Sequence, residues 1–250
     1  MNIQPEFQPL VTAADRHGRL RFGPRVAAAY LAGSVAAGEA WPTASDLDWF
    51  VFLHDEPAPA DHTWRRRQQK RLQRDFPAAA EVHLNLFSQD RLRQDTFSRF
   101  ILRYNAVRIR GDNIIAALQR QGVRTPRPSR RLAKSRLPFV RRCLSEALAG
   151  RRPPALATLP ADPFLAARKL ARNFVIVEGA FALMCRSSFQ SFKQEAVLQG
   201  LRRTSRRWRP LCRMTEAILR DPYRAQVQPD DLMVEVKPFM NWAITLTETA

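Results

Sequence analysis

Two aspartates separated by one residue, Asp46 and Asp48, begin a segment rich in aromatic and β-branched residues. Because residues two apart on a β-strand point to the same side, both carboxylates would share one face of a sheet. Carboxylate oxygens are the ligands that Mg²⁺ prefers, and two carboxylates this close repel each other unless a cation lies between them. The pair therefore predicts a metal-binding dyad on a strand.

A glycine and a serine, Gly33 and Ser34, precede the first aspartate with eleven residues in between. Glycine lets the backbone approach a phosphate closely, and serine supplies a hydroxyl and an amide donor. We therefore expect a phosphate-binding turn beside the dyad, in which Asp46 and Asp48 hold a metal on a triphosphate.

A third carboxylate, Glu81, begins a segment in which polar and apolar residues alternate, as on a half-buried strand. His83 and Asn85 would share its face. Glu81 would bind a second metal or act as a base toward an acceptor hydroxyl. A histidine in such a place is more often a hydrogen-bonding partner than a ligand, so His83 is not assigned to the site.

Each of these residues also has an ordinary structural explanation. An Asp-x-Asp pair can form a solvated turn before a strand, and Glu81 can be a charge at the edge of a sheet. Trp41, in the loop between the two motifs, can stack on a base or on the acceptor, or it can fill a hydrophobic gap. The nucleotide site is the preferred interpretation because the Gly-Ser pair, the aspartates and the alternating strand occur together.

The motifs are similar to those of a known family. The Gly-Ser pair, the loop, and the two aspartates flanked by apolar residues resemble the signature of the polymerase-β-type nucleotidyltransferase superfamily. The segment Glu81–Leu84 resembles the strand that carries the third acid in aminoglycoside 3″-adenylyltransferase-like enzymes. The segment Ala106–Asp112 is similar to their following strand, although Arg110 departs from the usual aromatic-Gly ending. A Ser-Phe-Lys run, in which Phe192 precedes Lys193, is similar to their Ser-Lys-x-x-Ala helix start.

This resemblance implies a small mixed-sheet catalytic domain followed by a helical bundle. It implies transfer of a nucleoside monophosphate, commonly AMP, from a nucleoside triphosphate such as ATP to a hydroxyl, with pyrophosphate leaving in line. It also implies two Mg²⁺ ions on the three acids, and nucleotide binding by Gly33, Ser34 and Lys193.

Hydrophobic periodicity predicts an α/β or α+β fold, with a mixed-sheet domain over residues 1–122 and a helical bundle over residues 123–250. In the first part we expect an apolar helix ending near Tyr30, strands at 46–53, 81–87 and 106–110, and helices at 62–76 and 91–104. In the second we expect helices at 129–149, 163–186, 192–220 with a kink after Leu201, and 230–247. Proline-rich linkers are expected at 125–129 and 152–163.

The charge of the chain is strongly positive and uneven. With 41 Lys and Arg against 23 Asp and Glu, the 250 residues carry a net charge of +18. Residues 1–111 hold 16 basic and 12 acidic side chains, whereas residues 112–250 hold 25 and 11, with dense basic runs at 120–152 and 202–213. This excess predicts an anionic partner and disfavours a polycationic acceptor such as an aminoglycoside.

The acceptor that this charge favours is RNA, such as a tRNA end, or a nucleic-acid-associated protein, as in toxin–antitoxin nucleotidyltransferases. Trp208 would stack on an exposed base, and the phosphates would be bound by Arg202, Arg206, Arg209 and Arg213. Two alternatives stay open. One is an aminoglycoside-type small-molecule adenylyltransferase, and the other is a catalytically idle module of the same fold that binds nucleic acid or protein.

Three cysteines, Cys143, Cys185 and Cys212, are odd in number and far apart, which is typical of small buried residues rather than disulfides or metal ligands. No stretch reaches the roughly 18 apolar residues of a membrane helix. The first residues lack the basic segment and apolar core of a secretory signal. We therefore expect a cytoplasmic protein without a membrane partner.

Overall fold

The computed structural model describes residues 3–149 and 159–248 of the chain. The chain divides into two compact units, Met1–Pro126 and Arg127–Ala250. None of the helices in the described residues combines the length and the apolar character that crossing a bilayer requires. Of the linker expected at 152–163, residues 152–158 lie outside the described part of the chain.

The first unit contains one four-stranded sheet in the order β3-β2-β1-β4. Its strands are β1 (Val26–Ala32), β2 (Leu47–Leu53), β3 (Val82–Ser88) and β4 (Ala106–Gly111). β1 pairs antiparallel with β2 and with β4, whereas β2 and β3 run parallel. The predicted mixed sheet is confirmed, with its three expected strands in place.

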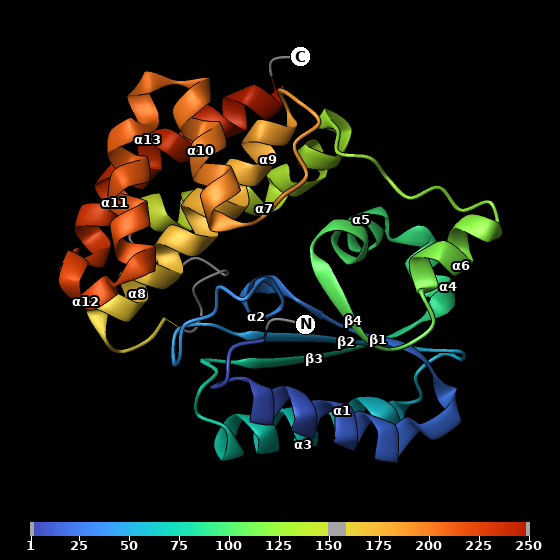
Figure 1. The fold of residues 1–250 in the computed structure, drawn as a ribbon. Helices are drawn as coiled ribbons and strands as arrows, with labels where there is room; N and C mark the ends of the chain where they lie inside the picture. Colours follow the sequence, from blue (N-terminus) through green and yellow to red (C-terminus); the bar gives the residue numbers. More distant parts are fainter. Residues whose placement is uncertain (1–2, 150–158, 249–250) are drawn as a thin grey trace. The chain divides into compact units, whose positions relative to one another are not determined.

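Helices cover both faces of this sheet (Figure 1). One face carries α1 (Gln8–Phe22) and α3 (Pro59–Asp75), and the other carries α4 (Gln89–Gln94), α5 (Thr96–Tyr104) and α6 (Ile114–Arg120). The short α2 (Gly33–Ala37) follows β1. The helices expected at 62–76 and 91–104 are present, the second interrupted at Asp95.

Alternation along β2 separates its apolar from its polar side chains. Leu47 and Trp49 are buried with residues of α1 and α3. Phe52 points the other way and is buried with residues of α4, α5 and α6. Asp46 and Asp48 have the same parity as Phe52, so they belong to the face of the sheet that α4, α5 and α6 cover.

The prediction of a helix ending near Tyr30 is wrong, because Val26–Ala32 forms the strand β1. Its run of alanines favours a helix by intrinsic propensity. In the fold, however, β1 lies between β2 and β4 and is buried on both faces, where small side chains leave room for helices above and below. Pairing with two neighbouring strands outweighs the propensity of the alanines.

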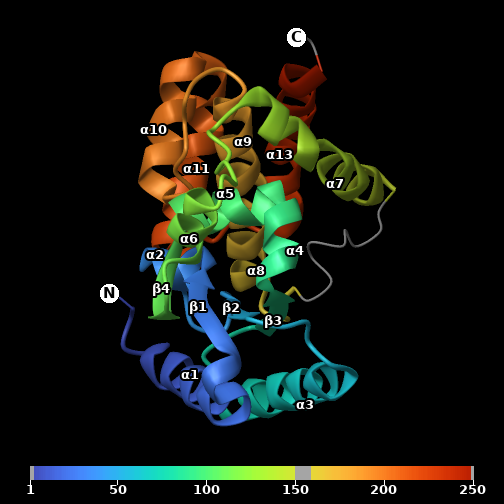
Figure 2. The same cartoon turned by 90° about the vertical axis from the view of Figure 1, so that its right-hand side faces the viewer.

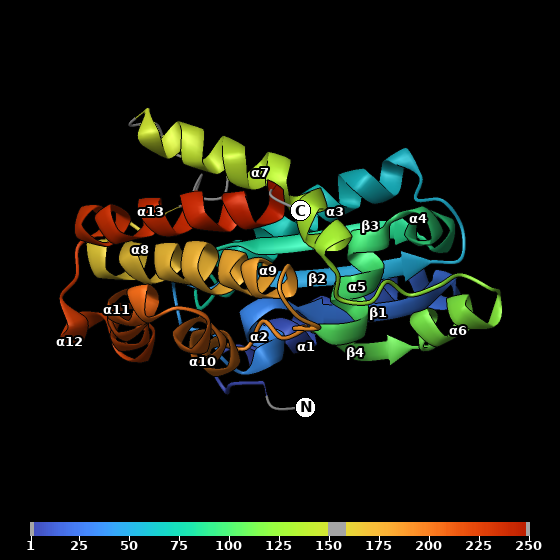
Figure 3. The ribbon, with the colours of Figure 1, turned by 90° about the horizontal axis from the view of Figure 1, so that it is seen from above.

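The second unit is a helical bundle, as predicted (Figures 2 and 3). Its helices are α7 (Arg130–Leu148), α8 (Pro163–Leu170), α9 (Glu178–Met184), α10 (Gln194–Thr204), α11 (Arg209–Arg220), α12 (Pro222–Ala225) and α13 (Pro229–Glu248). A π-helical stretch, Ala171–Val177, joins α8 to α9. The kink expected after Leu201 lies at Ser205, where α10 gives way to a 3₁₀ turn.

A buried carboxylate, Asp61, ties α3 to the start of the sheet. Its Oδ1 accepts a hydrogen bond from Arg21 at 2.9 Å, and its Oδ2 accepts from Arg25 and from the Ala58 amide, both at 3.0 Å. Burial alone would raise the pKa of Asp61, but the hydrogen bonds from Arg25, Ala58 and Arg21 hold it below its usual value.

We expect Asp61→Asn to lower the free energy of unfolding by about 2–4 kcal/mol at neutral pH, because the arginines lose a buried charged partner. The lowered pKa means that this contribution is present above about pH 3.9 and is lost as the pH falls through the folded pKa. Asp55→Asn is the control, since Asp55 also pairs with Arg25 but is exposed. Denaturant unfolding between pH 2 and pH 7 checks the prediction; equal losses in both variants would contradict it.

A second buried carboxylate, Glu178 of α9, lies 3.2 Å from the Arg136 guanidinium. Burial, opposed by Arg136, raises the pKa of Glu178 to about 7. The folded protein therefore keeps a proton that the unfolded chain releases near pH 4.5. The stabilisation that Glu178 contributes is fully present below about pH 4.5 and is lost as the pH rises through about 7.

In the wild type, the free energy of unfolding should fall by on the order of 2 kcal/mol between about pH 4.5 and pH 7 because of Glu178. We expect this fall to be absent in Glu178→Gln, because glutamine has no proton to release. Glu216→Gln is the control, because Glu216 is a half-exposed carboxylate that also pairs with arginine. Thermal unfolding across the pH range measures the effect. If wild type and Glu178→Gln keep parallel profiles, the burial-driven rise in pKa is wrong.

Candidate active site

The turn at the end of β1 brings a glycine against a carboxylate. Ala32, the last residue of β1, pairs with Asp48 of β2. The next residue, Gly33, has a φ of +73°, and a Cβ atom there would lie 2.7 Å from Asp48 Oδ2. Only glycine both adopts this backbone conformation without strain and leaves room for the carboxylate. Gly33 and Asp48, predicted as neighbours in one site, are in contact, and Ser34 follows directly in α2.

The parallel pairing of β2 with β3 arranges the remaining polar residues. Asp48 is the register partner of His83. Two residues earlier along each segment, Asp46 lies beside Glu81. Side chains of paired residues in adjacent strands project to the same face, so the four groups form two rows on one face of the sheet.

Two backbone hydrogen bonds hold the row formed by Asp46 and Glu81 in place. The Leu47 amide donates to the Glu81 carbonyl at 2.8 Å, and the Ala80 amide donates to the Ser45 carbonyl at 2.9 Å. These bonds flank Asp46 and extend the parallel ladder by one residue beyond the strand. Asp46 and Glu81 are therefore positioned by the sheet rather than by a free loop.

Ligand atoms of Asp46, Glu81 and His83 all lie within 4.8 Å of one another. His83 Nε2 is 3.2 Å from Glu81 Oε2. Asp48 is not part of this group of three, and its carboxylate lies against Gly33 instead. His83 was not assigned to the site from the sequence, and the signal that could have included it is the Glu-x-His spacing on an alternating strand.

The loop between the two motifs is held by short contacts. The Trp41 amide donates to Ser45 Oγ at 2.8 Å, and the Ser45 amide donates to the Trp41 carbonyl at 2.9 Å. The Thr43 amide reaches the Ala78 carbonyl at 2.7 Å. The loop thus leads the chain into Asp46 along a defined path, and stacking by the half-buried Trp41 stays a prediction.

In the helical unit, the arginines predicted to bind RNA divide into two kinds. Arg206, Arg209 and Arg213 are exposed. Arg202 forms an ion pair with Glu216, which lowers its availability for phosphates.

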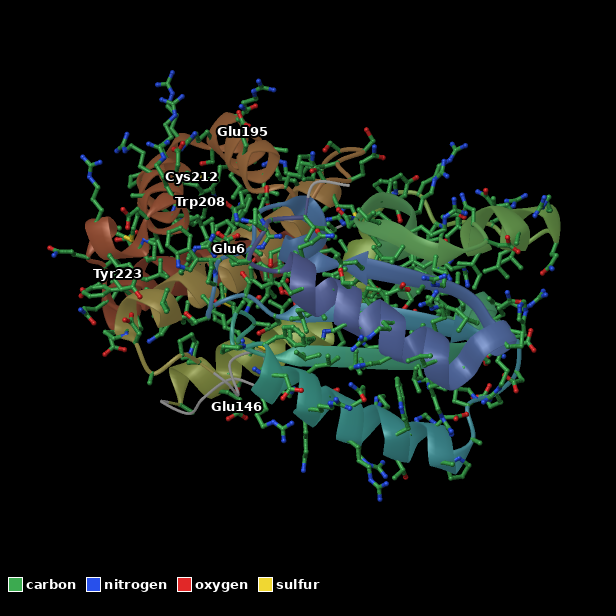
Figure 4. All side chains as sticks on the ribbon, turned by 60° about the horizontal axis from the view of Figure 1, so that its bottom comes forward. Glu6, Glu146, Glu195, Trp208, Cys212 and Tyr223 are labelled. Carbon is green, nitrogen blue, oxygen red and sulfur yellow. The ribbon has the colours of Figure 1, made fainter. Side chains whose placement is uncertain are left out.

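The prediction that Trp208 stacks on a base is wrong. Its side chain is 4% exposed and packs on Phe239 and Trp242, with ring centroids 5.3 Å apart in both cases. Figure 4 shows Trp208 and Cys212 among the helices, with nitrogen-tipped side chains extending outward from the same unit. The tryptophan completes the bundle core, because its large apolar surface is worth more there than at the surface.

Lys193, the predicted nucleotide-binding lysine, also belongs to the helical unit. It precedes the first residue of α10 and is exposed, and its amide donates to Ser191 Oγ at 3.1 Å. Its contact with a nucleotide stays a prediction.

The cysteines do not supply a nucleophile. Cys143 and Cys212 are buried, and Cys185 is half-buried. Burial raises the pKa of the Cys212 thiol to about 11 and also raises the pKa of Cys185. These two thiols stay protonated at neutral pH, and a protonated thiol is a poor nucleophile.

No protein-family model matches this sequence, and no curated protein sequence matches it. Among solved structures, the chain is similar to spectinomycin adenyltransferase AAD(9) from Enterococcus faecialis, whose crystal structure contains ATP and spectinomycin. The TM-score is 0.59 at 9% identity, over 96% of this chain and 98% of that chain. At this identity the likeness establishes the fold alone: a mixed α+β domain with a four-stranded sheet, followed by a helical domain.

Proposed function

We propose that this chain is a nucleotidyltransferase that moves a nucleoside monophosphate, with AMP expected, from a nucleoside triphosphate to an acceptor hydroxyl. The observation that carries the proposal is the packing of Asp48 against Gly33, beside the carboxylates of Asp46 and Glu81. A backbone turn that admits no side chain and a face of converging carboxylates are what a metal-bound triphosphate requires. The similarity in fold to an enzyme crystallised with ATP supports the same reaction class.

Each residue has a defined part in this reaction. The backbone at Gly33 and the hydroxyl of Ser34 bind phosphate oxygens, with Lys193 as a further predicted contact. Glu81 either accepts the proton of the acceptor hydroxyl or binds a second metal ion, in which case the proton passes to solvent water. The acceptor oxygen bonds to the α-phosphorus while the bond from that phosphorus to the β-phosphate breaks, so that pyrophosphate leaves.

The donor set fits Mg²⁺, because Asp46, Asp48 and Glu81 offer only carboxylate oxygens. Asp46 and Asp48 would hold one ion, and Glu81 with Asp46 a second. When bound, Mg²⁺ neutralises the charge of the triphosphate and of the leaving pyrophosphate. The role of the chain is to present the acids from paired strands, in an arrangement that exists before the nucleotide arrives.

The proposed acceptor is RNA. The support is the net charge of +18 and the exposed arginines of the helical unit, which attract a polyanion. The other acceptor that this charge favours is a nucleic-acid-associated protein.

A small-molecule acceptor is the second candidate, favoured by the spectinomycin in the similar structure. A catalytically idle binding module is the third, and the intact Gly33, Ser34, Asp46 and Asp48 argue against it.

Transfer is tested with nucleoside triphosphates labelled at the α- or the γ-phosphate, Mg²⁺, and RNA, protein or aminoglycosides in separate reactions. We expect α-label on RNA and γ-label in pyrophosphate. Label on the drug alone would select the second candidate. No transfer, with salt-sensitive RNA binding retained by an Asp46→Ala/Asp48→Ala variant, would select the third.

We expect joint substitution of Arg206, Arg209 and Arg213 by Gln to weaken RNA binding and to reduce its salt dependence. Three lost contacts to single-stranded RNA lower the slope of log K against log salt by about 2. The affinity for the nucleoside triphosphate should not change. The control substitutes Arg66, Arg67 and Arg74, three exposed arginines of α3, and so removes equal charge elsewhere. An equal effect of both triple variants would rule out a specific surface.

A further inference from the structure

We propose that His83 is a metal ligand, and that Asp46, Glu81 and His83 form a mixed nitrogen–oxygen site which binds Mn²⁺ more tightly than Mg²⁺. The inference deepens the proposed function, since Asp46 would belong both to this site and to the all-oxygen site with Asp48. It does not depend on turnover, because binding of the ion needs only the three side chains.

The separations suit a shared ion. Donor atoms around one tetrahedral or octahedral ion lie about 3–4 Å apart, because each sits about 2.1 Å from it. The ligand atoms of Asp46, Glu81 and His83 already lie within 4.8 Å of one another. Small side-chain rotations therefore suffice, with no change in the backbone.

The backbone under these side chains is fixed from two directions. On one side, the Leu47 amide bonds to the Glu81 carbonyl at 2.8 Å. On the other, α3 holds the edge strand, because Gln69 Oε1 accepts from the Leu84 amide at 3.3 Å and Gln73 Nε2 donates to the Ala80 carbonyl at 3.1 Å. Glu81 and His83 therefore start from a preorganised segment, and the ion does not have to order it.

The ligand types decide the choice of ion. Mg²⁺ prefers oxygen and seldom takes imidazole, whereas Mn²⁺ and the later transition metals accept nitrogen. The side chains of Glu81 and His83 are 30% and 40% exposed, so an ion can reach them from solvent. The competing explanation is a simple ion pair between the two, which at this exposure contributes little to stability.

The test is a titration of metal-free protein with Mn²⁺, without nucleotide and at a mildly alkaline pH. Continuous-wave EPR measures free Mn²⁺, and pulsed EPR detects the ¹⁴N nucleus of a bound imidazole. We expect a bound ion with a ¹⁴N signal in the wild type. In His83→Gln we expect loss of that signal and at least about 10-fold weaker Mn²⁺ binding, with Mg²⁺ affinity measured by competition changing far less.

His54→Gln is the matched control, because His54 is an exposed histidine of the same unit just beyond β2. It should bind Mn²⁺ as the wild type does, and thermal unfolding should be alike for all three proteins. Absence of Mn²⁺ binding, or a bound ion with no ¹⁴N signal and equal affinity in His83→Gln, overturns the inference. Failure of nucleotidyl transfer with the ¹⁴N signal intact would count against the proposed function alone.

Discussion

An Asp48→Asn protein should transfer the α-phosphoryl label about 10³-fold more slowly than the wild type, while folding normally. Asparagine has the same shape but removes the negative charge that would hold the cation on the triphosphate. Without bound metal, Asp46, Asp48 and Glu81 repel one another, so removal of one charge should not lower the unfolding temperature. Label transfer and thermal unfolding measure the two effects.

The control for this prediction is Asp55→Asn, an exposed aspartate just past the end of β2. It should keep wild-type transfer. An Asp48→Asn protein with activity within a few-fold of the wild type would show that the carboxylate beside Gly33 takes no part in the reaction.

Gly33→Ala should lower both stability and activity. Alanine at a φ of +73° costs about 1–2 kcal/mol, and its Cβ would meet Asp48 Oδ2 at 2.7 Å. The carboxylate must move away, and a displacement near 1 Å in a catalytic group costs about 10²-fold in rate. We expect the free energy of unfolding to fall by about 1–3 kcal/mol and transfer to fall by about two orders of magnitude.

Gly18→Ala provides the contrast. Gly18 lies within α1 and, apart from its own helix backbone, no atom lies within 4 Å of the place that a methyl group would take there. Alanine favours a helix by about 1 kcal/mol over glycine, so this variant should be at least as stable as the wild type and fully active. If Gly33→Ala behaves like Gly18→Ala, the turn does not position Asp48.

The pattern of polar and apolar residues predicted much of the fold, because in most helices and strands this pattern matches which side chains are buried. The segment after Glu81 alternates in sequence and alternates in burial along β3. The helices from 129 onward begin and end close to their predicted positions. The prediction of a helix over Val26–Ala32 was wrong because the conformation of this segment depends on two strands that pair with it from elsewhere in the chain.

The site was predictable as a set of residues but not as an arrangement. Spacing indicated that Asp46 and Asp48 share a face, but it did not reveal that Asp48 turns toward Gly33. The place of His83 depends on the register of two parallel strands, which no single segment determines. The prediction that Trp208 stacks on a base was wrong for a related reason: the arginines that flank it in the sequence do not indicate whether its side chain is buried.

Whether Asp46 and Asp48 hold a cation on a triphosphate can be seen by anomalous diffraction from crystals soaked with Mn²⁺ and a non-hydrolysable triphosphate. We expect an anomalous peak within bonding distance of Asp46 and Asp48, about 2.1–2.3 Å, with the phosphates against the backbone of Gly33 and Ser34. A triphosphate bound elsewhere, or a peak that neither aspartate touches, would contradict this expectation.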